Sequence, residues 1–338
     1  MADTVTTLSL ITLAQEYRGD IVRQINRRTV LLKMLPIVPG AGLNVAFAPE
    51  ADGQTAENYS DGADAVNFGG DVQASGVLSW GLYRANVHLS DLATDAAGSS
   101  STPMENRRLW AHNIINATAK LATTLNAAMY SGAGTGTTIA GLDAAIGSTT
   151  NTYAGINRST GGNAYFQPNV IDPGSLTAPT LALIRSDIAT IYTACGENPD
   201  LAVCSPAVFN KIGGLFDATR RQIDVVQTAR GAIRLDFGWQ ALEVDGTLFV
   251  KDKDATANQI YYLNTNHVKI QYLPPVGVPD APPQTIEADD GFGQVMLGMR
   301  YKKLATLGAS ERAQINTTLQ LVVDRPNSCG IRKNVNPA

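Results

Sequence analysis

The feature of the sequence that most restricts its fold is a long helical pattern that runs from Thr102 to Gly132. Thr102 fits an N-cap, Pro103 the first helical position and Glu105 the capping-box partner of Thr102. Apolar residues recur on one face at Trp110, Ile114, Ala117, Leu121, Leu125 and Ala128. At 1.5 Å per residue this helix is expected to form a rod of about 40 Å, far longer than the usual globular helix of about 11 to 12 residues.

A second unusual feature is an acidic segment, Ala48 to Asp71, that contains no basic residue. Its acidic residues are Glu50, Asp52, Glu57, Asp61, Asp64 and Asp71. Strand-like alternation flanks the segment at Leu43, Val45 and Phe47 and at Leu78, Trp80 and Leu82. We therefore expect this segment to be the tip of a long β-hairpin. The hairpin should rest on another part of the fold, because an isolated two-stranded hairpin is marginally stable in water.

The remaining patterns predict a mixture of helices and strands. Residues 13–36 have the periodicity of an amphipathic helical arm, and residues 132–176 are a Gly-, Thr- and Asn-rich connection. Further helical patterns occupy residues 177–196 and 207–216, and strand-like runs occupy residues 201–206, 241–252, 259–264, 267–273, 295–301 and 315–323. The sequence therefore predicts an α+β fold.

Composition excludes several classes of protein. The chain has 338 residues, of which 44% are apolar and 17% charged, which is typical of a globular protein rather than a disordered one. The net charge of −4 does not indicate a nucleic-acid or anionic-membrane partner. The start of the sequence does not resemble a signal peptide, and no apolar run is long enough to span a membrane. We expect a soluble protein made in a cytoplasm, with its three cysteines reduced.

The patterns that carry chemistry all favour structural interpretations. His88, His112 and His267 lie in different elements without metal-ligand spacing. Cys195 and Cys204 are best interpreted as inert thiols, without CxxC spacing. We therefore expect no catalytic residues, no metal site, no cofactor and no enzymatic activity.

Two loops resemble ligand-binding motifs only superficially. The glycines of "GAGTGTT", which begins at Gly132, follow a helix instead of a strand and lack the P-loop lysine, so a flexible helix exit is favoured. In "KDKDATAN", Asp252, Asp254 and Asn258 resemble a calcium loop, but the glycine and final glutamate of an EF-hand are missing. A hairpin turn is the favoured interpretation.

The order of these parts resembles that of the major capsid proteins of tailed bacteriophages, which have the HK97-type shell fold. "GLDAAI" followed by "YAGINRST" is similar to the segment after the long spine helix of such proteins, and "LAVCSPAVFNKI" to their strand, proline and helix pattern. "FGWQALEVDGTLFVKD" and "QIYYLNTNHVKIQYLP" resemble their axial-domain strands, and "LGASERAQINTTLQL" the last peripheral strand. One departure is "NAYFQPN", which replaces the usual tryptophan-containing continuation.

The resemblance implies an α+β, HK97-like capsid fold with five parts. They are an N-terminal arm (1–40), an extended β-hairpin called the E-loop (41–98), the spine helix with the peripheral-domain (P-domain) connection (99–175), a mixed α/β axial domain, or A-domain (176–285), and the returning peripheral strands with the C-terminus (286–338).

The function implied is that of a major capsid protein. Copies would assemble in the host cytoplasm into hexamers and pentamers and then into the icosahedral shell of a virion. The shell would enclose double-stranded DNA without sequence-specific binding, and a mildly acidic chain suits this because basic surfaces bind phosphate nonspecifically. Other partners would be a portal and separate scaffolding or decoration proteins, with no membrane. Two alternatives are an encapsulin-like nanocompartment shell and a strand-rich surface adhesin.

In this fold the E-loop reaches across a neighbouring subunit. The resemblance therefore implies that the acidic tip is part of the interface between subunits. Its six carboxylates repel one another, and arginines of a neighbour would relieve that repulsion. The candidates are Arg23, Arg27 and Arg28 of the arm and Arg107 and Arg108 of the spine helix. The alternative is that all these groups are ordinary solvated charges, worth about 0 to 1 kcal/mol per pair.

Three further expectations follow from the resemblance. Glycines near the hairpin and after the spine helix would act as flexible joints between quasi-equivalent positions, at Gly40, Gly42, Gly69, Gly70, Gly76, Gly132, Gly134 and Gly136. Because about ten residues precede the first helical periodicity, scaffolding would come from a separate protein or from none. Because the hairpin contains no lysine, covalent Lys–Asn cross-linking of the shell is not expected.

Overall fold

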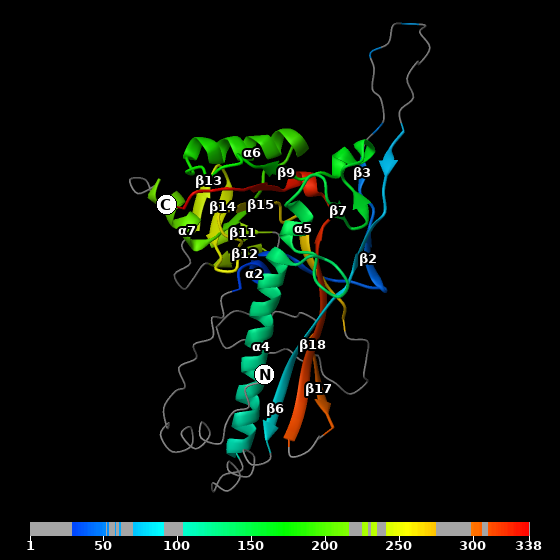
Figure 1. The fold of residues 1–338 in the computed structure, drawn as a ribbon, viewed down its shortest axis with the longest axis vertical. Helices are drawn as coiled ribbons and strands as arrows, with labels where there is room; N and C mark the ends of the chain where they lie inside the picture. The colour runs from blue at the N-terminus through cyan, green and yellow to red at the C-terminus, as the bar shows by residue number, and fades with distance from the viewer. Residues whose placement is uncertain are drawn as a thin grey trace. The chain divides into compact units, whose positions relative to one another are not determined.

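A computed structural model describes residues 29–51, 53, 58, 61, 70–90, 104–215, 225–228, 231–234, 241–274, 299–305 and 310–337 (Figure 1). The chain divides into two compact units. Unit 1 comprises Met1–Thr29, Leu82–Leu125 and Leu273–Thr318, and unit 2 comprises Val30–Gly81, Asn126–Tyr272 and Leu319–Ala338. Each unit is therefore assembled from segments that are far apart in the sequence.

Helix α4 (Met104–Ser131) confirms the long helix, and it ends immediately before Gly132 as predicted. Leu121 and Leu125 of the predicted apolar stripe are buried, whereas Thr102 and Pro103 lie outside the described residues.

The glycine-rich exit from α4 is a hydrogen-bonded loop instead of the flexible connection expected. The Gly134 N–H donates to the Ile139 carbonyl at 3.0 Å, and the Gly141 N–H donates to the Gly132 carbonyl at 2.8 Å. A Cβ on Gly132 would lie 2.2 Å from the Ile139 carbonyl oxygen. The close approach of two backbone segments therefore explains this glycine.

Strand β18 (Ser310–Val323) confirms the last predicted strand, and its N-terminal part belongs to unit 1. There it pairs antiparallel with β17 (Arg300–Leu304), and Asn316 lies opposite Arg300. Strand β6 (Gly81–Ser90) also pairs with β18. Most of the preceding predicted run, residues 295–298, lies outside the described residues.

In unit 2, the C-terminal part of β18 pairs antiparallel with β16 (Val268–Tyr272). Strand β16 also pairs in parallel with β1 (Ile37–Pro39), which follows the short helix α2 (Leu31–Met34). In the part of β18 that belongs to unit 2, Leu321 and Val323 are fully buried. These strands pack their apolar side chains into the interior of unit 2.

The main sheet of unit 2, here called the β10 sheet, has the strand order β13-β14-β10-β15-β19-β9 within the described residues. The bounds are β13 (Ala241–Val244), β14 (Thr247–Lys251), β10 (Leu201–Cys204), β15 (Ile260–Leu263), β19 (Gly330–Arg332) and β9 (Asn169–Ile171). Strand β19, from the C-terminal segment, lies between β15 and β9.

The prediction of a hairpin turn at "KDKDATAN" is wrong. Strands β14 and β15 flank β10, which is parallel to β14 and antiparallel to β15. The segment therefore passes over the end of β10 instead of joining neighbouring strands. Its Asp252 and Asp254 both accept hydrogen bonds from the Asn126 side-chain amide, at 2.9 and 2.8 Å. These two carboxylates therefore contact α4, a helix that is distant in the sequence.

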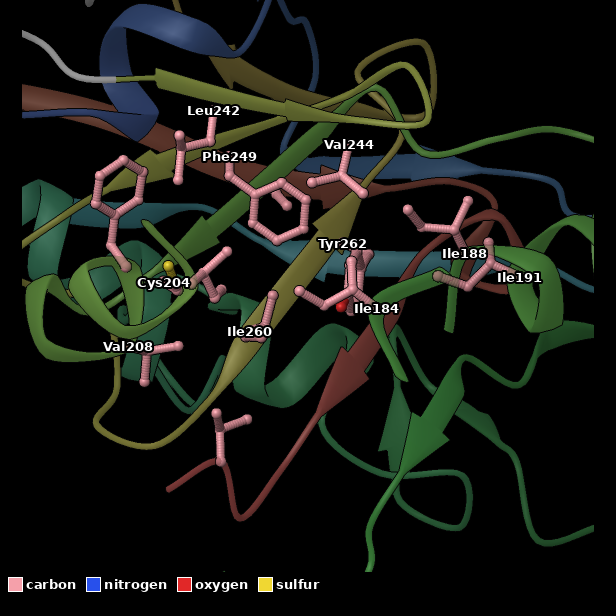
Figure 2. Close-up of a cluster of buried hydrophobic side chains, with 14 residues drawn as sticks. Ile184, Ile188, Ile191, Cys204, Val208, Leu242, Val244, Phe249, Ile260 and Tyr262 are labelled. Atoms are coloured by element: carbon pink, nitrogen blue, oxygen red, sulfur yellow. The ribbon is translucent and has the colours of Figure 1, made fainter. Parts of the chain in front are cut away.

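Helices α6 (Leu181–Cys195) and α7 (Pro206–Gly214) contribute apolar side chains to a core shared with the β10 sheet (Figure 2). Thr180 caps α6 by accepting a hydrogen bond from the Leu183 N–H at 3.2 Å, and Gly196 ends the helix in the left-handed conformation at φ 78°. The labelled residues of this core are Ile184, Ile188, Ile191, Cys204, Val208, Leu242, Val244, Phe249, Ile260 and Tyr262.

The cysteine interpretation agrees with this core. Cys204 and Cys329 are buried and Cys195 is partly buried, and all three are free thiols. Burial raises the pKa of the Cys329 thiol to about 12 and also raises that of Cys204. A thiol that stays protonated at neutral pH is a poor nucleophile, so these two groups serve as small apolar side chains.

The remaining elements are short. Paired strands are β2 (Asn44–Phe47) with β5 (Gly76–Ser79), β3 (Glu50–Ala51) with β4 (Val72–Gln73), β7 (Thr152–Tyr153) with β8 (Ile156–Asn157), and β11 (Val225–Thr228) with β12 (Gly231–Arg234). Short helices are α5 (Leu142–Ile146) and the 3-10 turns η1 (Gly161–Phe166) and η2 (Pro326–Ser328).

A buried ion pair joins α6 to the C-terminal strand. The Arg332 guanidinium donates two hydrogen bonds to the Asp187 carboxylate, both at 2.5 Å, and the Tyr262 hydroxyl donates a third at 3.1 Å. These hydrogen bonds raise the pKa of Arg332, although burial opposes the increase. The carboxylate thus has donors from both β19 and β15, which ties the C-terminal strand to the core.

Removal of one partner of this pair should be costly. Asp187→Ala leaves a buried, unpaired arginine, and we expect it to lower the free energy of unfolding by about 3 to 5 kcal/mol. Urea-induced unfolding of the unassembled subunit measures this loss. The matched double variant Asp187→Leu with Arg332→Met leaves no charge behind and should be much closer to the wild type. Equal losses in the two variants would contradict the assignment.

Candidate assembly site at the hairpin

The predicted hairpin is present, and its two arms pair in register. Phe47 lies opposite Gly76 where β2 meets β5, and further out β3 pairs with β4 so that Glu50 lies opposite Gln73. The Ala74 N–H donates to the Pro49 carbonyl at 3.1 Å, which joins the two pairs of strands. Figure 1 draws the arms in blue and cyan.

The described acidic side chains of the tip lie at the surface, although Pro49 at its base is buried. Glu50, Asp61 and Asp71 are exposed, and Asp71 accepts a hydrogen bond from the Gly53 N–H at 3.3 Å. Asp52, Glu57 and Asp64 lie outside the described residues. The described carboxylates therefore face solvent and not the core of their own subunit.

The candidate partner arginines are only partly covered by the structure. Arg23, Arg27 and Arg28 lie outside the described residues, and Arg107 and Arg108 belong to α4 but their side chains are not described. Pairing between the tip and these arginines stays a prediction.

One face of the hairpin is buried within unit 2, as expected for a hairpin that must rest on another part of the fold. Val45 and Leu78 lie opposite each other and are only 2% and 5% exposed. On the other face, Ala46 and Val77 also lie opposite each other and are exposed. The same two strands thus present a packed face and a free face, because side chains alternate along a strand.

The hairpin rests on the tight turn between β7 and β8. The Val77 N–H donates to the Ala154 carbonyl at 2.8 Å. Ala154 and Gly155 form the turn with φ values of 52° and 79°, the conformation of a type I′ turn. This conformation is common for glycine but strained for alanine. A strained residue therefore presents the carbonyl that holds β5.

Aromatic rings complete this contact. The ring centroids of Phe47 and Phe166 are 6.2 Å apart, and those of Phe166 and Tyr153 are 6.1 Å apart. The Phe47 ring lies over Gly76, where a Cβ would be 2.8 Å from a ring atom. We call Phe47, Gly76 and Val77, with Tyr153, Ala154 and Phe166, the hairpin root. Aromatic packing over a cross-strand glycine pins the register of two strands.

A buried arginine lies against the same rings. Arg158 is fully buried, and its guanidinium carbon is 4.9 Å from the centroid of Tyr153 and 5.1 Å from that of Phe166. One guanidinium nitrogen donates to the Ser148 carbonyl at 3.3 Å and to the Asn151 side-chain oxygen at 3.2 Å. Burial lowers the pKa of Arg158 to about 10, so the side chain stays charged at neutral pH.

A further contact orients the start of the hairpin. The Trp80 indole N–H donates to the Gly42 carbonyl at 3.0 Å, and Gly42 has φ 86°. A Cβ on Gly40 would lie 2.5 Å from the Trp80 ring. Gly40 and Gly76 were expected to be flexible joints, but the structure shows that both lie under aromatic rings. Close packing is the physical reason for these two glycines.

The described residues do not reveal a second kind of site. Among them, no three histidine, cysteine or carboxylate side chains are grouped so that they could hold a metal ion. None of the helices in the described part of the chain is both long and apolar enough to cross a membrane.

Comparison with known proteins identifies the family. The family model described as "SU10 major capsid protein" matches residues 83–336, about three quarters of the chain. The chain belongs to the SU10 major capsid protein family. No curated protein sequence matches it. Members of this family form capsids, so the role of the chain is structural, and the family implies a non-enzymatic protein that is part of a virion.

Solved structures show the same fold over nearly the whole chain. A capsid subunit of cyanophage A-1(L) is similar with 18% identity and a TM-score of 0.74, covering 99% of each chain. The native GTA particle capsid is similar with 14% identity and a TM-score of 0.56, covering 96% of this chain and 99% of the other. The expected HK97-like capsid fold is confirmed, and self-association into capsomers is supported.

The same fold also occurs in a nanocompartment shell. The SrpI encapsulin from Synechococcus elongatus PCC 7942 is similar with 11% identity and a TM-score of 0.55, covering 95% of this chain and 94% of the other. At this identity the likeness shows the fold alone. The match to the SU10 family favours the capsid interpretation over the encapsulin alternative.

Sequence reasoning missed the hairpin root, although part of its signal was visible. Residues 153–158 read "YAGINR", in which Ala-Gly between two apolar residues is a weak two-residue hairpin signal. The arginine that follows gives no sign of burial, because arginine is almost never buried without a partner. Only the fold brings Phe47 and Phe166 to this turn.

The strain at Ala154 has a measurable consequence. Ala154→Gly should raise the free energy of unfolding by about 0.5 to 1 kcal/mol, because removal of about 1 to 2 kcal/mol of left-handed strain exceeds the entropic cost of glycine. The control Ala46→Gly, in the extended backbone of β2, should lower it by about 0.5 to 1 kcal/mol. Thermal unfolding of the two variants should shift in opposite directions, and shifts of the same sign would contradict the strain.

Proposed function

We propose that this chain assembles into hexamers and pentamers that close into an icosahedral shell around double-stranded DNA. Membership of the SU10 family and the HK97-like fold support the proposal. The net charge of −4 suits a wall that encloses DNA without sequence-specific binding. Assembly in the host cytoplasm belongs to this proposal, as do a portal and separate scaffolding or decoration proteins as partners.

Negative-stain microscopy of the purified protein tests the proposed assembly. Shells or capsomers would support the proposal, and a monodisperse monomer at high concentration would argue against it.

The observation that carries the proposal is the division of the hairpin into a packed root and an exposed tip. Val45 and Leu78 anchor the root in unit 2, whereas Glu50, Asp61 and Asp71 extend into solvent. These exposed carboxylates add nothing to the core of their own subunit and are free to contact another molecule. We propose that this molecule is a second copy, across which the tip reaches.

Charge indicates which residues of a neighbouring subunit the tip would contact. No Lys or Arg lies between Lys33 and Arg84, so the acidic tip has no basic neighbour within its own stretch of sequence. Arginines of a neighbouring subunit would relieve this repulsion at short range. The proposed groups are Arg23, Arg27, Arg28, Arg107 and Arg108. The proposed role is one of geometry and contact, without catalysis and without a cofactor.

Removal of the tip should separate folding from assembly. The register places Phe47 opposite Gly76, so replacement of residues 48–75 by Asn-Gly joins a cross-strand pair through a favoured two-residue turn. The subunit should remain folded by circular dichroism, because the described tip contributes little apolar surface to its core. Electron microscopy should show no closed shells. Normal particles from this variant would disprove the role of the tip.

An amide variant distinguishes the charge of the tip from its shape. Glu50→Gln, Asp61→Asn and Asp71→Asn, combined with the same change at Asp52, Glu57 and Asp64, remove the charge and keep the length of the hairpin. We expect shells to form less efficiently and with a weaker dependence on ionic strength, because screened charge pairs no longer contribute. If the salt dependence of assembly is unchanged, the arginine pairing is wrong even where the deletion abolishes assembly.

Mature shells should be held together without covalent cross-links. Lys–Asn isopeptide bonds require an amine on the hairpin, but Lys33 precedes it and the next lysine in the sequence is Lys120. Arginine is not a substitute because its guanidinium stays protonated. Purified particles boiled in denaturant and reductant should therefore run as a monomer near 35.8 kDa. A ladder of multimers under those conditions would show that cross-links form by another route.

A further inference from the structure

Arg158 is a buried cation with only part of its hydrogen-bonding capacity used. One nitrogen has two acceptors, Ser148 and Asn151, at 3.2 to 3.3 Å. The other two nitrogens, Nε and Nη2, are buried and have no hydrogen-bond partner among the described residues. No carboxylate in the described part of the chain forms an ion pair with it. Stacking against two aromatic faces is the main favourable contact that remains, and it is stronger where water is excluded.

An arginine is a poor choice if this position serves stability alone. Replacing a buried charge by an apolar side chain of similar volume is often neutral or stabilising. The rings of Tyr153 and Phe166 would pack equally well against an apolar side chain at this position. The presence of a half-satisfied guanidinium therefore calls for a role other than stability.

The rings that hold Arg158 also hold the hairpin. The guanidinium carbon lies over the rings of Tyr153 and Phe166, and Phe166 packs against Phe47 of β2. Tyr153 precedes Ala154, whose carbonyl accepts the Val77 N–H of β5. Both strands of the hairpin are thus attached to elements that Arg158 joins. The same side chain reaches the loop after α5 through Ser148 and Asn151.

We infer that Arg158 is a positioning residue that sets the direction in which the hairpin leaves unit 2. Its planar guanidinium fixes the angle between the β7–β8 turn and the Phe166 ring, and these two groups hold β5 and β2. The effect on assembly rests on the proposed function of the tip, whereas the effect on the root does not.

The planar shape of the group is essential to this role. A guanidinium stacks flat on a ring and donates in fixed directions, whereas a lysine ammonium is a compact charge on a flexible stem. A methionine fills a similar volume but neither stacks as a cation nor donates to Ser148 and Asn151. Neither replacement can hold the two rings at a fixed angle.

The test compares Arg158→Met and Arg158→Lys with a control, Arg185→Met. Arg185 is an exposed arginine of α6 that pairs with Asp245 at 3.2 Å, so its replacement changes charge and composition equally without contact to the root. The full-length chain is studied both unassembled and under assembly conditions. Urea unfolding measures stability, hydrogen exchange of residues 76–79 measures the Val77 hydrogen bond, and electron microscopy measures shell formation.

We expect Arg158→Met to unfold at the same or a higher urea concentration than the wild type. Hydrogen exchange at Val77 should nevertheless be at least tenfold faster, and closed shells should fall by a similar factor. Arg158→Lys should also exchange faster, and Arg185→Met should match the wild type in all three measurements. If Arg158 only stabilised the fold, faster exchange and fewer shells would occur only in variants that unfold at a lower urea concentration. That result would overturn the inference.

The two readouts separate this inference from the proposed function. Faster exchange with normal shells would support the positioning role but contradict the role of the hairpin in assembly. Unchanged exchange would overturn the positioning role whatever happens to the shells. If Arg158→Met does not fold, Arg158→Lys provides the test, because it keeps the charge and removes the planar guanidinium. It should still exchange faster at Val77, and normal exchange would overturn the inference.

Discussion

The fold depends most directly on how an extended hairpin is held at one end only. Two strands cannot support themselves in water, and this hairpin gains its support from a strained turn at Ala154, a ring contact between Phe47 and Phe166, and a buried cation at Arg158. These contacts involve one face of the hairpin, so the other face and the tip are free. A capsid subunit needs both a supported root and a free tip. A segment that contacts a neighbour must have a fixed direction and must not be buried in the core of its own subunit.

The rest of unit 2 provides a rigid base for that arrangement. The β10 sheet combines strands from residues 169 to 332, and the buried pair of Asp187 and Arg332 ties the C-terminal strand to α6. Pairing between strands that are distant in the sequence is expected to slow folding. After β18 the chain enters the β10 sheet as β19, where it pairs with both β15 and β9.

Local patterns predicted those parts whose stability is local. The long helix was readable because its apolar stripe and Gly132 define a face and an end. The run 241–252 was predicted as one strand, whereas the structure divides it into β13 and β14 at a turn formed by Asp245 and Gly246. The turn expected at residues 251–258 was wrong because periodicity cannot reveal that β10 inserts between β14 and β15. The exit after Gly132 was expected to be flexible because glycine and threonine composition does not reveal the backbone hydrogen bonds that join Gly132 and Gly134 to Gly141 and Ile139.

The sequence by itself determined the order of elements, the acidic hairpin without lysine and the likeness to phage capsid proteins, because periodicity, turn residues and charge are written along the chain. Only the tertiary structure decided which residues hold the hairpin and which glycines are packed instead of flexible. Phe47 and Phe166 are more than one hundred residues apart in the sequence, and their contact exists only once the sheets have formed. Arg158 and the rings that it contacts, Tyr153 and Phe166, are close in the sequence, but only the folded structure shows that the arginine is buried between them and the rest of unit 2.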